Sequence, residues 1–175
     1  MKVGLIGLPG SGKSTLFNLL TGVEASPSGD KRGAIGVAKV PDPRIDRLAA
    51  MYNPRKTTYA AITVTEVPGL VPTGLRQAVP GLQGLDPKGF VDGLRDVDAL
   101  VYVVRAFEAA AVPHVRGEVD PAQDVAALAE ELLLTDWQLV QTRLERLNSA
   151  KKRQPDHEAQ LRALSRAAEA LETGK

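Results

Sequence analysis

Residues 7–14 read GLPGSGKS, between an apolar stretch at residues 2–6, KVGLI, and the segment STLFNLL at residues 14–20. The apolar residues of the later segment recur at helical spacing, so the sequence predicts a strand, a glycine-rich turn and a helix, in that order. The turn matches G-x-x-x-x-G-K-(S/T) at every fixed position, and this pattern folds so that backbone N–H groups point at phosphate oxygens. We therefore expect a phosphate-binding loop near the start of the chain.

Each residue type in this loop has a physical role in holding a triphosphate. Glycines permit the curled backbone, and the start of the helix adds a partial positive charge. Lys13 supplies a charge for the β and γ phosphates, and the Ser14 hydroxyl is a ligand for Mg²⁺. We predict a catalytic role for Lys13, and we predict that the nucleotide-binding residues include Gly7, Pro9, Gly10, Ser11, Gly12, Lys13 and Ser14.

A site of this kind needs a second carboxylate for Mg²⁺ at the end of a neighbouring strand. Residues 57–65 are β-branched and alternating, which predicts a strand, and Glu66 follows it. Glu66 is therefore the second predicted metal ligand. Gly69 is predicted to offer an unobstructed N–H to the γ-phosphate. The competing interpretation is that Glu66 caps a loop and that residues 68–69 form an ordinary turn.

The composition excludes several classes of protein. The chain has 175 residues, of which 43% are apolar and 25% charged, so it is long and apolar enough to fold around a core. No apolar run is long enough to cross a membrane, and the net charge of +1 gives no overall attraction for DNA. The absence of cysteine excludes disulfides and thiolate chemistry. We expect a cytoplasmic protein that binds neither membrane nor DNA.

The remaining pattern predicts an α/β domain followed by helices. A strand is expected at residues 37–40, a helix at 45–51 and a central, doubly covered parallel strand at 99–104, with loops at 25–36 and 71–89 and a short helix at 90–94. From residue 122 to residue 153 there is neither glycine nor proline. Apolar residues there are spaced 4-3-4-3, and a second such helix follows Pro155. We predict a nucleotide-binding domain at 1–120 and an antiparallel helical hairpin at 121–175.

Several motifs occur together in a specific order: GLPGSGKS at 7–14, PDPR at 41–44, EVPGLV at 66–71, VVRAFE at 103–108 and HVRGEVDP at 114–121. This set closely resembles the YchF (Obg-like ATPase) family, a branch of the Obg-type translation-factor GTPases. The resemblance implies a P-loop NTPase fold of the Ras-like kind, with a partial, mainly parallel sheet and a coiled-coil arm. It also implies slow hydrolysis of ATP or GTP and association with ribosomes.

The resemblance assigns further roles by motif match. Thr15 joins the phosphate and Mg²⁺ residues, and Gly69 becomes the sensor of the γ-phosphate. Leu70 stands where many GTPases have a glutamine that orients the attacking water. An apolar side chain cannot orient water by hydrogen bonding, so we expect slow turnover.

The chain departs from the family pattern in three respects. Glu66 replaces the usual aspartate, and Asp30 stands where the family has a threonine that can complete the Mg²⁺ shell. The base-recognition motif and the C-terminal TGS domain are not found in the chain, so the preference for ATP or GTP stays open. Two explanations are open, namely a piece of a longer protein or a diverged paralogue.

Two other functions are compatible with these residues. In the first, Glu66 and Asp30 prevent hydrolysis, and the helical arm acts as an interaction module for a ribosome or protein. The second, a small-molecule kinase, ranks lower because the 71–89 loop offers only Arg76 for a substrate lid. Residues 151–153, KKR, would either contact ribosomal RNA or form a solvated turn. We interpret Trp137 as a core residue and His114 as structural.

Overall fold

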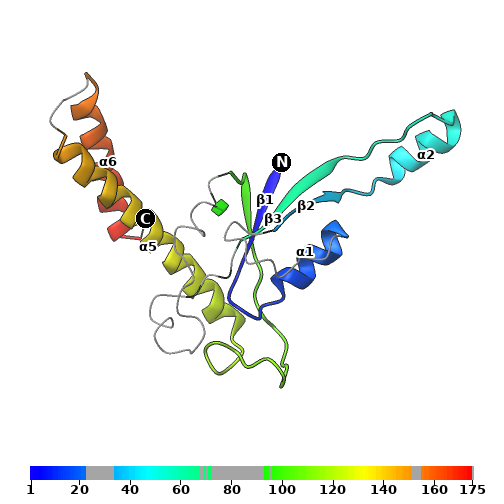
Figure 1. Cartoon of the computed structure of the whole chain (residues 1–175), viewed down its shortest axis with the longest axis horizontal. Coiled ribbons are helices and arrows are strands. Elements are labelled where there is room, and N and C mark those ends of the chain that lie inside the picture. The colour runs from blue at the N-terminus through cyan, green and yellow to red at the C-terminus, as the bar shows by residue number, and fades with distance from the viewer. Residues whose placement is uncertain are drawn as a thin grey trace. The chain divides into compact units, whose positions relative to one another are not determined.

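The computed structural model describes residues 1–22, 34–67, 69, 71, 93–94, 96–150 and 155–174 (Figure 1). The chain divides into two compact units, Met1–Val125 and Ala126–Lys175. The predicted loop at 25–36 lies mostly outside the described residues, as do the loop at 71–89 and the helix at 90–94.

Within the described residues the first unit is built on a four-stranded sheet with the order β2-β3-β1-β4. The strands are β1 (Lys2–Ile6), β2 (Ala34–Lys39), β3 (Ala61–Glu66) and β4 (Ala99–Tyr102). β1 pairs in parallel with both β3 and β4, whereas β2 pairs antiparallel with β3. The described sheet is therefore mixed, and two of its three pairings are parallel, in agreement with the expectation of a mainly parallel sheet.

Helix α1 (Lys13–Thr21) packs on this sheet, and the core lies between them. Leu5, Phe17, Ala38 and Val64 are buried there, one from each of β1, α1, β2 and β3. Gly36 lets the helix approach closely, because a methyl group at that position would lie 2.5 Å from Thr21 Cγ2. The helix ends at Gly22, whose φ of 67° is the left-handed conformation that glycine tolerates.

Helix α2 (Pro43–Tyr52) lies between β2 and β3 in the sequence and projects from the sheet (Figure 1). Asp42 caps its first turn, because its carboxylate accepts the Arg44 backbone N–H at 2.9 Å. Pro43 occupies the first helical position, where no N–H is needed. None of the residues of α2 is buried.

Some predicted boundaries and environments are wrong. β2 begins at Ala34 rather than at residue 37, and β3 begins at Ala61 rather than at residue 57. β4 is not a central, doubly covered strand. It lies at one end of the described strand order, and Val101 and Tyr102 are exposed.

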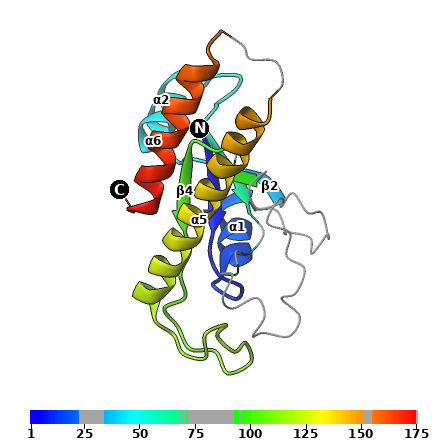
Figure 2. The same cartoon turned by 90° about the vertical axis from the view of Figure 1, so that its left-hand side faces the viewer.

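The second unit contains most of α5 (Pro121–Asn148) and all of α6 (His157–Glu172). Both helices are found where the sequence predicts them, and they run side by side in Figures 1 and 2. Trp137 Nε1 donates to Glu172 Oε1 at 3.3 Å, and Trp137 is half-buried. The KKR segment at 151–153 lies outside the described residues. Among the described helices, none combines the length and the apolar character that a membrane crossing requires.

Candidate functional site

The loop between β1 and α1 has the backbone that its glycines predict. Gly10 and Gly12 have φ values of 75° and 97°, which side-chain-bearing residues rarely adopt. Gly7 is required for another reason, because a methyl group there would lie 2.2 Å from the carbonyl oxygen of Val103. The loop is therefore fitted closely against the segment that follows β4.

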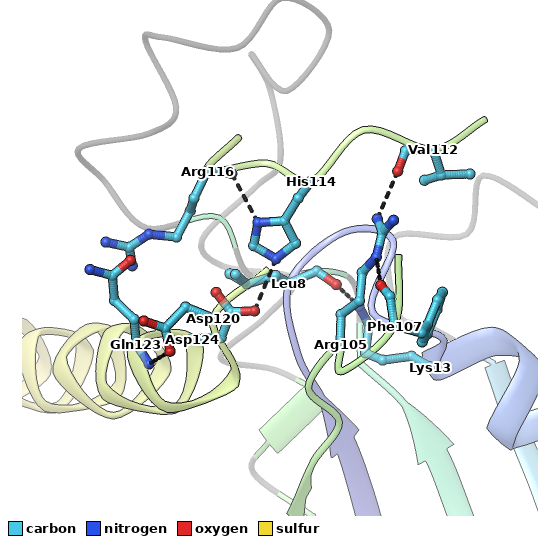
Figure 3. Close-up of polar contacts among 10 residues, drawn as sticks. All are labelled: Leu8, Lys13, Arg105, Phe107, Val112, His114, Arg116, Asp120, Gln123 and Asp124. Carbon is cyan, nitrogen blue, oxygen red and sulfur yellow. Dashed lines mark hydrogen bonds and ion pairs between the residues drawn. The ribbon is translucent and has the colours of Figure 1, made fainter. Parts of the chain in front are cut away.

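Lys13 is buried beneath this loop, with 7% of its surface exposed. Its Nζ donates to the carbonyl oxygen of Gly7 at 2.9 Å and to that of Leu8 at 3.0 Å, the second of which is drawn in Figure 3. Burial lowers the pKa of Lys13 to about 8, and the nearby Glu66 carboxylate acts in the opposite direction. The ammonium group thus lies inside the curl of its own loop, where an incoming phosphate would compete with the two carbonyls.

The Ser14 hydroxyl donates to Glu66 Oε1 at 2.5 Å. Ser14 is the second residue of α1, and Glu66 is the last residue of β3. The parallel register that pairs Leu5 with Glu66 carries this carboxylate to the end of β1, where the loop begins. The structure therefore brings together the two residues that the sequence predicts as metal ligands, and oxygen donors of this kind suit Mg²⁺.

The other predicted residues lie around this centre. A methyl group on Gly69 would come 3.5 Å from Lys13 Nζ and 3.5 Å from Pro9 Cγ, so Gly69 lies beside the lysine. Ser11 is buried, and its hydroxyl has no hydrogen-bond partner among the described residues. Thr15 is exposed on α1. Asp30 and Leu70 lie outside the described residues.

Sequence reasoning missed a buried polar pair near the loop. His114 Nε2 lies 3.0 Å from Asp124 Oδ2, and the side chains are 3% and 1% exposed. The Arg116 backbone N–H donates to His114 Nδ1 at 3.3 Å, so Nε2 carries the proton that Asp124 accepts (Figure 3). Both ring nitrogens are thus engaged. The one signal in the sequence was a histidine shortly before a helix that carries an aspartate in its first turn.

A family model described as 50S ribosome-binding GTPase matches residues 2–142. The chain belongs to this GTPase family. Ribosome-binding ATPase YchF of Bacillus subtilis is 37% identical over 180 residues, which cover 100% of this chain and 48% of the relative. Obg-like ATPase 1 of Oryza sativa subsp. indica is 34% identical over 165 residues, which cover 92% of this chain and 40% of the relative.

The same family is found among solved structures. The structure of the Schizosaccharomyces pombe YchF GTPase matches with a TM-score of 0.67 and 29% identity, over 100% of this chain and 48% of that one. The resemblance to the YchF family is therefore confirmed, and the fold is that of a P-loop GTPase with a mixed sheet and flanking helices. This GTPase-family chain spans about half the length of the relatives that it matches.

Proposed function

We propose that this GTPase-family chain binds a purine nucleoside triphosphate, ATP or GTP, with Mg²⁺, and cleaves it slowly to the diphosphate and phosphate. The observation that supports this most is the position of Lys13. Its buried Nζ lies within the loop formed around Gly10 and Gly12, beside Gly69. Positive charge and the backbone N–H groups of a glycine-rich turn suit the β and γ phosphates.

The donor set supports a role for Mg²⁺. Ser14 Oγ and Glu66 Oε1 lie 2.5 Å apart, and Mg²⁺ prefers oxygen ligands of this kind. We propose that these two residues hold the ion, Glu66 as an outer ligand. When bound, Mg²⁺ would neutralise charge on the phosphates. Gly7, Pro9, Ser11 and Thr15 complete the proposed phosphate-contacting set.

The proposed turnover is slow for a chemical reason. Leu70 follows Gly69, and an apolar side chain cannot hold an attacking water by a hydrogen bond. Lys13 and the loop N–H groups still stabilise the charge that develops on the phosphate oxygens. The proposed roles of Lys13 and Gly69 are therefore charge stabilisation and recognition of the γ-phosphate.

The proposed partner is the ribosome, in the cytoplasm. Relatives from Bacillus subtilis and Haemophilus ducreyi are named ribosome-binding ATPases. We propose that α5 and α6 form the helical arm at 121–175 and that this arm carries the ribosome contact. The basic run at 151–153 would attract ribosomal RNA phosphates.

A fluorescent-nucleotide titration tests the nucleotide proposal. ATP and GTP analogues are titrated with and without Mg²⁺ against wild type, Lys13→Ala and the control Lys39→Ala, whose side chain is exposed on β2. We expect Mg²⁺ to tighten binding, Lys13→Ala to abolish it and Lys39→Ala to leave it unchanged. The base that binds more tightly identifies the nucleotide. Absence of binding to either analogue by folded wild type would overturn the proposal.

A second candidate function is an interaction module that does not hydrolyse nucleotide. Glu66 in place of the family's aspartate, and Asp30 in place of its threonine, favour this candidate. Release of phosphate under saturating nucleotide and Mg²⁺ separates the two functions. Turnover that Lys13→Ala abolishes supports the hydrolase. Binding without turnover supports the module.

A further inference from the structure

The side chain of Arg105 is buried next to the phosphate-binding loop, with 2% of its surface exposed. It follows β4 by three residues, and the nucleotide site proposed above gives it no role. In the part of the chain that the structure describes, no carboxylate lies within ion-pair distance of its guanidinium group. A buried cation without a counter-charge among the described residues needs a physical explanation.

The guanidinium group satisfies its donors with backbone carbonyl groups of one short segment. Nε donates to Phe107 at 3.0 Å, Nη1 to Val112 at 2.7 Å and Nη2 to Ala109 at 3.2 Å. Figure 3 shows the guanidinium group bonded to the carbonyl oxygens of Phe107 and Val112. The Phe107 ring adds a cation–π contact, with its centroid 5.1 Å from Arg105 Cζ. Arg105 therefore links the backbone carbonyl groups of Phe107, Ala109 and Val112.

This segment lies against the turn that would hold the phosphates. A methyl group on Gly10 would lie 3.2 Å from Val112 Cγ1 and 3.8 Å from Arg105 Nη1. Gly10 has a φ of 75°, so the N–H groups on either side of it depend on a backbone conformation that needs support. Val112, whose carbonyl accepts from Arg105, therefore lies beside Gly10 on one side of the turn.

We propose that Arg105 is a positioning residue for the phosphate-binding loop. It fixes residues 107–112 against Gly10, and its charge raises the attraction of the loop for an anion. This inference rests on the nucleotide-binding function proposed above. A lysine cannot fully replace Arg105, because its single ammonium group cannot reach the three carbonyl oxygens that the planar guanidinium group contacts.

The test compares nucleotide affinity in Arg105→Gln, Arg105→Lys and the control Arg47→Gln, whose side chain is exposed on α2. Fluorescent analogues of the triphosphate, the diphosphate and the nucleoside are titrated against each protein. We expect Arg105→Gln to weaken triphosphate binding about tenfold or more, because small displacements of a binding loop have large effects. Arg105→Lys, which keeps the charge, should recover only part of this loss, and Arg47→Gln should bind as wild type does.

The way in which the loss of affinity depends on the number of phosphates distinguishes a positioning role from a general loss of structure. A positioning role predicts that the loss is largest for the triphosphate, smaller for the diphosphate and absent for the nucleoside. Equal affinities of wild type and both Arg105 variants would overturn the inference while leaving the nucleotide-binding function intact. An equal loss for all three ligands would also overturn it. If wild type binds no nucleotide, the proposed function fails, and this inference fails with it.

A second variant keeps the inference testable if Arg105→Gln does not fold. Val112→Ala removes the methyl groups that lie beside Gly10 and keeps the Val112 carbonyl to which Arg105 donates. We expect a smaller, phosphate-dependent loss of affinity with little change in melting temperature. Triphosphate affinity equal to wild type in this variant would contradict the proposed support of Gly10.

Discussion

The Ser14 hydroxyl and the Glu66 carboxylate, 52 residues apart in the sequence, meet at 2.5 Å where α1 begins and β3 ends. The contact depends on the parallel pairing of β1 with β3, because that pairing brings Glu66 to the loop. It joins the two oxygen donors that we propose for Mg²⁺. A change at Glu66 should therefore alter the response to the ion more than the fold.

The first prediction concerns Glu66. Glu66→Gln should reduce the tightening of nucleotide binding by Mg²⁺ about tenfold or more, because an amide is a weaker ligand than a carboxylate and leaves the charge of the ion unbalanced. Glu66→Asp should keep the response, because aspartate is the usual residue of the family. Titration at several Mg²⁺ concentrations measures this, with Glu118→Gln as an exposed control. An unchanged Mg²⁺ response in Glu66→Gln would remove Glu66 from the metal site.

The second prediction concerns Lys13 and pH. Burial lowers its pKa from 10.5 to about 8, so between these values the unfolded chain binds more protons than the folded chain. The free energy of unfolding should therefore rise with pH across this window, on the order of 3 kcal/mol in total, relative to Lys13→Met. Urea unfolding of both proteins at pH 7 to 10.5, with EDTA and without nucleotide, measures the difference. A difference that does not vary with pH would show that the buried lysine does not titrate there.

The third prediction compares two glycines of the loop. Gly7→Ala should lower the free energy of unfolding by about 3 kcal/mol, because the new methyl group would overlap the Val103 carbonyl oxygen. Gly12→Ala meets no atom within 4 Å, so its cost is only the left-handed backbone, about 1–2 kcal/mol. Denaturant unfolding of the two variants decides the order. If Gly12→Ala is the more destabilised protein, the close fit of Gly7 against Val103 is wrong.

The fourth prediction concerns the buried pair of His114 and Asp124. Asp124→Ala leaves the Nε2–H of His114 buried without its acceptor, and we expect a loss of about 3 kcal/mol. Glu118→Gln, an exposed change four residues from His114, should have almost no effect. Thermal unfolding of wild type and both variants tests this. Equal melting temperatures of Asp124→Ala and wild type would mean that the pair contributes little to stability.

Local sequence patterns predicted the first strand, loop and helix correctly. The strand, loop and helix at residues 2–21 follow from signals a few residues apart, and the structure has β1 and α1 there. The predicted start of β3 is wrong because a strand extends only as far as it has a neighbouring strand to pair with. Lys39 of β2 pairs with Ala61, the Val40 N–H bonds to the Ala60 carbonyl, and Lys2 of β1 pairs with Thr63, so residues 57–59 lie beyond the paired residues of both neighbouring strands. Alternation alone does not contain this information.

Part of the candidate site could be read in the same way. Lys13 and Ser14 follow from one motif, and Glu66 follows from its position after a predicted strand. The apolar run at 99–104 was read as a central strand, yet Val101 and Tyr102 are exposed, because an apolar run does not report how a strand is covered. Arg105 could not be assigned at all. Its role depends on three carbonyl groups whose positions are set by the tertiary path of residues 107–112.

Helix α2 has a consequence for how the chain tolerates change. The pairing of β2 with β3 ends before α2 begins. Its last pair is Lys39 with Ala61, and next to it the Val40 N–H donates to the Ala60 carbonyl at 2.9 Å. No residue of α2 is buried, and the entropy of closing a loop changes slowly with its length. We therefore expect that residues 41–59 can be shortened, lengthened or replaced by an epitope tag while the sheet that carries the phosphate-binding loop keeps its register.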